Sequence, residues 1–219
     1  MQYVERYWES QDWVTVTLVG CLLLLAVARY LYPKRFQEFI LLPITDKYFL
    51  VQAKNNRLGH PFNALLFAVQ VVAVSLLIYS AFAYYSPDVV QSNSWLFVQI
   101  CTAYTVFVIA KFCIEKIVGA VFALDEVINE YLFEKLSYRN LIAILLVVVN
   151  IIFFYIVDIN ALWLWIILAA VLVFNAIALF YSYKNNRNLI SRHFFYFILY
   201  LCALEISPYV LLYKWWELG

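Results

Sequence analysis

Six long apolar stretches decide what this chain can fold into. A helix crosses a hydrocarbon core of about 30 Å with about 20 mostly apolar residues. The stretches of this kind are Trp13–Tyr32, Phe62–Tyr85, Trp95–Ile117, Leu141–Val157, Leu162–Tyr183 and His193–Trp216. Pro33 ends the first stretch, since the residue before a proline avoids the helical region. The sequence therefore predicts an all-α integral membrane bundle of about six transmembrane helices.

The composition excludes a soluble fold of this size. Of the 219 residues, 66% are hydrophobic and 13% are charged, whereas soluble domains hold roughly 45–50% apolar and about 25% charged residues. A lipid bilayer must cover the excess apolar surface. We expect residues 1–219 to form a single polytopic membrane domain. The net charge of +1 gives no reason to expect nucleic acid as a partner.

The basic residues provide an independent test of these spans, because Lys and Arg collect in cytoplasmic loops. Thirteen of the fifteen fall in or beside the first, third and fifth connections. Only Arg6 and Lys214 lie on the other side. This alternation predicts that the N-terminus and the C-terminus are both periplasmic. Six tryptophans mark the predicted outer boundary, as interfacial Trp belts do: Trp13, Trp95, Trp163, Trp165, Trp215 and Trp216.

Two cytoplasmic segments have amphipathic patterns. Lys34–Leu42 mixes charges with Phe36 and Phe39, as a short interfacial helix does. Val118–Tyr138 places apolar residues at helical spacing. We expect the second segment either to extend the third spanning helix into the cytoplasm or to lie on the membrane surface.

Glu205 is the clearest candidate for an intramembrane functional group. It lies about 15 Å inside the outer boundary of the last span, near the midplane. A charged residue at that depth costs about 3 kcal/mol or more. Pro208 leaves a backbone carbonyl unbonded beside it. Glu205 is therefore either a proton- or cation-binding carboxylate, or a protonated side chain that holds the bundle together.

Other spans place polar residues at a similar depth. Asn150, Asn175, Gln70 and Thr105 come from four different predicted helices. Such side chains avoid lipid and bond across helices. We expect a buried network that includes Glu205, and the pattern does not distinguish a hydrated path from simple packing.

Lys111 and Glu115 lie one helical turn apart near the inner end of the third span. They can pair at i, i+4, and Lys111 can reach the cytoplasmic surface with its long side chain. We expect a structural role for both.

No recognisable catalytic set or cofactor site is present. His60 and His193 are the only histidines, and both lie near the cytoplasmic boundary, which argues against haem and against a histidine-based zinc site inside the bundle. The four cysteines match no metal spacing. We therefore predict no catalytic residues, no metal and no cofactor.

Several stretches resemble an uncharacterised multipass membrane family of Bacteroidota, catalogued only as a domain of unknown function. The stretches are YLYPKRF at Tyr30–Phe36, HPFNALLF at His60–Phe67, YLFEKLSYRN at Tyr131–Asn140 and LYLCALEISPYVLLYK at Leu199–Lys214. The likeness extends over most of the chain. It implies a location in the bacterial inner membrane, and it implies no activity and no site residues.

Three functions agree with these observations. The leading hypothesis is a non-enzymatic membrane subunit or scaffold that binds membrane-protein partners, since glycines are few and outer loops are short. The second is a small proton-coupled transporter that uses Glu205. The third is an enzyme for a lipid-linked substrate, with phosphate held at the cytoplasmic surface by Arg35, Arg57, His60 or Arg192.

Overall fold

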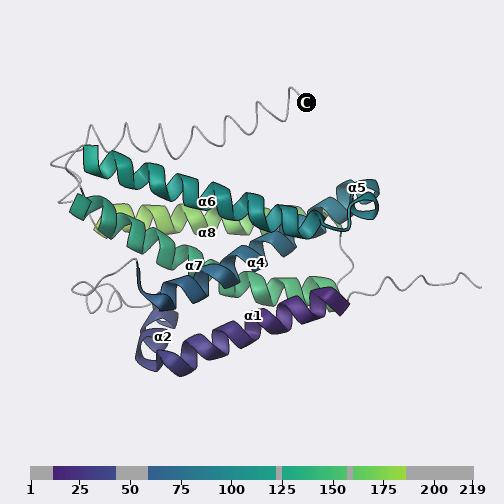
Figure 1. Cartoon of the computed structure of the whole chain (residues 1–219), viewed down its shortest axis with the longest axis horizontal. Coiled ribbons are helices and arrows are strands. Elements are labelled where there is room, and N and C mark those ends of the chain that lie inside the picture. Colours follow the sequence, from purple (N-terminus) through teal and green to yellow (C-terminus); the bar gives the residue numbers. More distant parts are fainter. Residues whose placement is uncertain (1–11, 43–58, 122–124, 157–159, 186–219) are drawn as a thin grey trace, which may run out of the picture.

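The computed structural model of the chain describes residues 12–42, 59–121, 125–156 and 160–185. Every regular element in these ranges is a helix, which confirms the predicted all-α class there (Figure 1). The helices are α1 (Asp12–Leu31), α2 (Pro33–Ile40), α4 (Pro61–Tyr85), α5 (Pro87–Ser92), α6 (Leu96–Val121), α7 (Asp125–Tyr155) and α8 (Ala161–Asn185). The sixth predicted span, with Glu205, lies outside the described residues.

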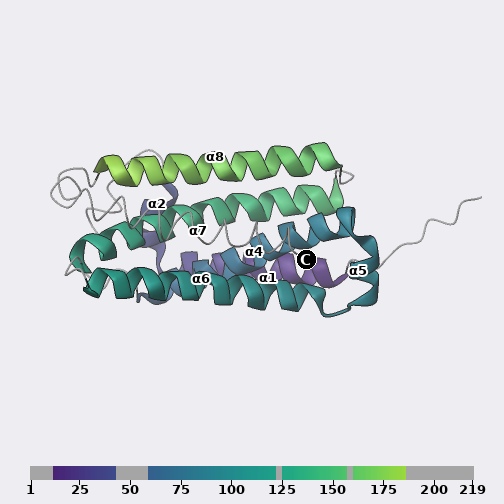
Figure 2. The ribbon, with the colours of Figure 1, turned by 90° about the horizontal axis from the view of Figure 1, so that it is seen from above.

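The long helices run alternately up and down a bundle. In Figures 1 and 2, α1, α6 and α8 run in one direction, and α4 and α7 run in the other. The C-terminal ends of α1, α6 and α8 therefore lie at the same end as the N-terminal ends of α4 and α7. All Lys and Arg residues in the described ranges lie in the half of the bundle next to that end, which we call the basic end: Arg29, Lys34, Arg35, Lys111, Lys116, Lys135, Arg139 and Lys184.

Four helices in the described ranges are long and apolar enough to cross a membrane. They are Asp12–Leu31, Pro61–Tyr85, Leu96–Val121 and Ile128–Tyr155. The first three nearly match the first three predicted spans, and the fourth overlaps the predicted span Leu141–Val157 but begins 13 residues earlier. Helix α8 has 25 residues, of which Ala161–Phe174 form a shorter apolar stretch in the described part. Large apolar side chains such as Leu23, Val106 and Leu172 are exposed on the outside of the bundle. These helices are compatible with a membrane protein.

Helices α4 and α7 form the centre of the bundle, with α1 and α6 against them and α8 against α7 (Figure 2). The middle of this arrangement is an apolar cluster from α1, α4 and α7. Its buried members are Val14, Leu18, Cys21, Val69, Ala73, Leu76, Ile142, Leu146 and Val147. Small residues at such crossings let helix backbones approach closely.

Helix α2 folds back onto the basic end of the bundle. Pro33 separates it from α1 and stands at its first position, where the missing N–H needs no partner. Phe39 is buried and packs against Phe62, with ring centroids 5.8 Å apart. The predicted amphipathic segment Lys34–Leu42 is therefore helical over most of its length, and Phe39 faces α4. Its position at a membrane surface stays a prediction.

The segment Val118–Tyr138 corrects both of our expectations. Helix α6 ends at Val121, and α7 begins at Asp125 and continues without interruption to Tyr155. No glycine or proline occurs between these bounds of α7 to break it. Most of the amphipathic segment is thus the first half of α7, the fourth candidate span, and Leu132 and Phe133 are buried in the bundle.

Candidate functional site

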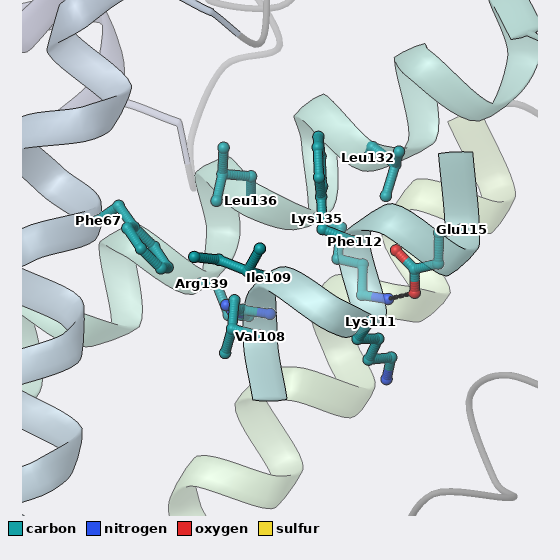
Figure 3. Close-up of a pocket in the computed structure, with 10 residues that line it drawn as sticks. All are labelled: Phe67, Val108, Ile109, Lys111, Phe112, Glu115, Leu132, Lys135, Leu136 and Arg139. Carbon is teal, nitrogen blue, oxygen red and sulfur yellow. Dashed lines mark hydrogen bonds and ion pairs between the residues drawn. The ribbon is translucent and has the colours of Figure 1, made fainter. Parts of the chain in front are cut away.

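Two pairs of charged residues on neighbouring helices face one cavity. Lys111 and Glu115 are one turn apart on α6, and Lys135 and Arg139 are one turn apart on α7, so each pair shares a helix face. Figure 3 draws all four side chains; Lys135 reaches Glu115, and the amine of Lys111 points away from that pair. We call this cavity the basic pocket. It has a volume of about 170 Å³ and is lined by Phe67, Val108, Ile109, Lys111, Phe112, Glu115, Leu132, Lys135, Leu136 and Arg139.

Glu115 forms an ion pair with a residue of the next helix. Lys135 Nζ donates to Glu115 Oε1 at 2.7 Å, and the two side chains are 12% and 3% exposed. Lys135 Nζ also lies 5.4 Å from the centroid of the Tyr131 ring, within the range of a cation–π contact. The ion pair ties α6 to α7. Sequence spacing had indicated Lys111 as the partner of Glu115.

Arg139 is bound by neutral groups. The Gln70 amide, oriented with its oxygen toward α7, accepts from Arg139 Nη2 at 2.9 Å, from Arg139 Nε at 3.0 Å and from the Tyr104 hydroxyl at 2.6 Å. Its nitrogen then donates to Asn140 Oδ1 at 3.0 Å. This orientation is the one that satisfies the hydrogen-bond network. Among the described residues, no carboxylate pairs with Arg139.

The basic pocket has a mostly apolar wall that includes the Arg139 guanidinium, with which no carboxylate of the described residues pairs. Three cations and one carboxylate line it. Lys111 is only 9% exposed, and a guanidinium keeps its charge in proteins. The remaining wall consists of aliphatic and phenyl side chains. Such a cavity favours a ligand with an anionic group and an apolar part.

The other predicted polar residues have separate environments. Asn150 is fully buried, and its Nδ2 donates to the Ala73 carbonyl of α4 at 2.8 Å. Thr105 Oγ1 donates to the backbone carbonyl of Cys101, in its own helix, at 2.7 Å, so this bond does not bridge helices. Gln70 and Asn150 thus bond to different partners at different levels. The side chain of Asn175 and all of Glu205 lie outside the described part, so their place in a network stays a prediction.

Two residues proposed for phosphate binding lie near each other at the basic end. His60 caps α4, where its Nδ1 accepts from the Phe62 N–H at 3.2 Å. Partial burial, and then the charge of Arg35, lower the pKa of His60 below its usual 6.5. A neutral imidazole is required for this cap, because a protonated ring nitrogen cannot accept. Arg57 and Arg192 lie outside the described residues. No cluster of three or more His, Cys, Asp or Glu in the described part is placed to hold a metal.

A family model described as "Domain of unknown function (DUF4271)" matches residues 14–216. The chain belongs to the DUF4271 family. This confirms the resemblance to a family catalogued only as a domain of unknown function, whereas a Bacteroidota origin stays a prediction. No curated protein and no solved structure matches this DUF4271 chain.

Sequence reasoning missed half of the charged residues in the pocket of this DUF4271 protein. Hydropathy predicts that the fourth span begins at Leu141, which places Lys135 and Arg139 in the cytoplasmic connection before it. Their i, i+4 spacing inside an unbroken helical pattern was the available signal. Tyr104 and Asn140 gave no signal, because their role depends on how α4, α6 and α7 are rotated against one another.

Proposed function

We propose that this protein is a six-span subunit of the bacterial inner membrane, with both termini in the periplasm. The four apolar helices, the length of α8 and the gathering of Lys and Arg at the basic end support this arrangement. Lys and Arg mark the cytoplasmic side, so the basic end would face the cytoplasm. The fifth and sixth spans complete an even number of crossings.

The proposed role is that of a non-enzymatic scaffold for membrane-protein partners. The supporting observation is the apolar packing of α1, α4 and α7 across the middle of the bundle. A carrier that alternates between two open states needs a polar path at its centre and helices that move past each other. Interlocked apolar side chains such as Leu18, Leu76 and Val147 favour a bundle that keeps one shape.

Affinity purification of the full chain in mild detergent, followed by mass spectrometry, tests the scaffold proposal. A membrane protein that copurifies at fixed stoichiometry is the expected result. Two matched variants then locate the contact: Val106→Trp on the exposed face of α6 and Leu23→Trp on the exposed face of α1. If α6 is the docking face, only the α6 variant loses the partner. A solitary monomer from the unmodified chain contradicts the proposal.

A second candidate is the proton-coupled carrier that uses Glu205. The observation in its favour is that Asn150 Oδ1 and Ser75 Oγ are buried without a hydrogen-bond partner in the described part of the chain. Buried polar atoms are normally satisfied by protein or water, and a Glu205 side chain or a hydrated path would satisfy them. Proton flux in liposomes that Glu205→Gln abolishes would favour the carrier. Equal flux for both forms would remove this candidate.

A further inference from the structure

We propose that the basic pocket between α6 and α7 binds the phosphate group of an anionic ligand, with a membrane lipid headgroup as the source. This inference goes beyond the scaffold proposal and does not depend on it. It rests on the residues that line the cavity and on their depth in the bundle.

The charge of Arg139 favours an anion in the pocket. Lys111, Lys135 and Arg139 line it, and Glu115 is the one carboxylate in its lining. Glu115 is already paired with Lys135 at 2.7 Å. Among the described residues, the Arg139 guanidinium donates to the Gln70 oxygen and pairs with no carboxylate. A phosphate would supply the charge that Arg139 lacks, through the charge-assisted bonds that guanidinium groups form with phosphate.

The partners of Arg139 hold it ready for such a ligand. Gln70 is nearly fully buried, and its side-chain oxygen accepts hydrogen bonds from Arg139 Nε, from Arg139 Nη2 and from the Tyr104 hydroxyl. These bonds orient the guanidinium from one side. Figure 3 shows Arg139 at the edge of the pocket, with Val108 and Ile109 beside it. A guanidinium carries five N–H donors, so the bonds to Gln70 leave donors for a second acceptor.

The depth of the pocket matches the headgroup region. Phe67 is in the second turn of α4, Lys111 and Glu115 are in the last three turns of α6, and Arg139 precedes the apolar half of α7. All three helices therefore contribute residues near the basic end, where the proposed cytoplasmic headgroups would lie. The apolar wall of Phe112, Leu132 and Leu136 would accept the glycerol and the first methylenes of an acyl chain.

Native mass spectrometry of the purified full chain tests the site. Phosphatidylglycerol, phosphatidylcholine with the same acyl chains, and inorganic phosphate are titrated separately. We expect phosphatidylglycerol to bind at one saturable site and phosphatidylcholine to bind much more weakly. Binding of inorganic phosphate at the same site with similar affinity would assign the pocket to the free ion, and binding of the lipid alone would assign it to headgroups.

Variants identify the pocket as the place of binding. Arg139→Gln and Lys111→Gln should each weaken phosphatidylglycerol binding about tenfold, as expected for the loss of a charged hydrogen-bond donor. Glu115→Gln should tighten binding, since it removes the competing carboxylate and releases Lys135. Arg29→Gln is the matched control, because Arg29 is exposed on α1 at the basic end and does not line the pocket.

The lysine and arginine variants are expected to weaken lipid binding, whereas Glu115→Gln is expected to tighten it. The test therefore stays decisive if one variant fails to fold. Arg139 also bonds Gln70 and Glu115 also pairs with Lys135, so Arg139→Gln and Glu115→Gln can lose their structure, but Lys111→Gln breaks neither of these contacts. Equal affinities in Lys111→Gln, Glu115→Gln and the unmodified chain would overturn the proposal. The proposal would also be overturned if Arg29→Gln lost as much affinity for phosphatidylglycerol as Lys111→Gln. Such a result would indicate that the charge of the whole basic end attracts the lipid.

Discussion

Glu115 and Lys135 provide the most direct test of packing at the scale of single residues. Both side chains are largely buried, and removal of one partner from such a pair leaves an uncompensated charge, which destabilises by about 3 kcal/mol or more. Replacement of both by apolar side chains of similar size can be nearly neutral. The pair therefore contributes more to the specificity of the α6–α7 contact than to net stability.

We predict that Lys135→Met lowers the free energy of unfolding by about 3 kcal/mol. Glu115→Leu combined with Lys135→Met should recover most of that loss. Unfolding by increasing fractions of a denaturing detergent, followed by circular dichroism, measures both. Lys116→Met is the control, because Lys116 lies on an exposed part of α6. A double variant as unstable as Lys135→Met alone would show that Lys135 acts through other contacts.

His60 makes a second prediction at this scale. Its pKa in the folded chain is lowered from 6.5 by burial and by Arg35. Below pH 6.5 the unfolded chain binds the proton more readily than the folded chain, so stability is full above that pH and falls as the pH decreases. The same imidazole ring makes a T-shaped contact with Tyr32, at 4.9 Å between ring centroids.

We therefore expect the midpoint of thermal unfolding to fall between pH 7.5 and pH 5.5, and to fall less in His60→Asn. An asparagine oxygen can accept from the Phe62 N–H as a helix cap and does not titrate. The difference between the two pH dependences is the measurement. An equal drop in both proteins would assign the acid sensitivity to other groups.

At the scale of elements, the end of α6 and the first turn of α7 approach each other closely. A Cβ atom at Gly119 would lie 3.2 Å from Ile128 Cδ1 and 3.4 Å from Ile128 Cβ. A large side chain there would separate the two helices that form the basic pocket. At Gly20 in α1, by contrast, nothing lies within 4 Å of an added Cβ.

Gly119→Leu should therefore destabilise the chain by about 1–3 kcal/mol, the usual range for overpacking, whereas Gly20→Leu should have little effect. Ile128→Ala combined with Gly119→Leu should recover part of the loss because it makes room for the leucine. Detergent unfolding of the four proteins gives the comparison. Equal stability of the two leucine variants would contradict a close approach of α6 to α7 at Gly119.

The elements also show what the sequence could predict. The bounds of α1, α4 and α6 follow from hydropathy, from Pro33 and from Pro61, because chain length and apolar content decide whether a segment spans. The true length of α7 was missed, since the charges before Leu141 hid a helix that has no breaking residue. The pairing of Glu115 with Lys135 depends on the rotation of α6 relative to α7, which one sequence does not encode in any local pattern.

At the scale of the whole molecule, the distribution of charge connects the fold to its orientation. All Lys and Arg residues of the described ranges lie in the half next to the basic end, whereas Asp12 begins α1 at the opposite end. A lipid environment would account for the exposed apolar surface, and the charge asymmetry would then set the orientation of the bundle in the membrane. An even number of spans would place both ends of the chain on the side away from the basic residues.

We predict that a cysteine in place of Gln2 and a cysteine in place of Gly219 both react with a membrane-impermeant thiol reagent. The reagent is added to cells whose outer membrane has been permeabilised and whose inner membrane is intact. A cysteine in place of Asn55 should react only after the inner membrane is broken, because Lys47, Lys54 and Arg57 around it mark a cytoplasmic connection. The background for all three is a chain whose four native cysteines are replaced by serine or alanine. Labelling at Gln2 without labelling at Gly219 would mean an odd number of spans, and α8 or the segment after it would then fail to cross. Labelling at Asn55 in intact cells would invert the bundle and would place the basic pocket, and the lipid proposed for it, in the opposite leaflet.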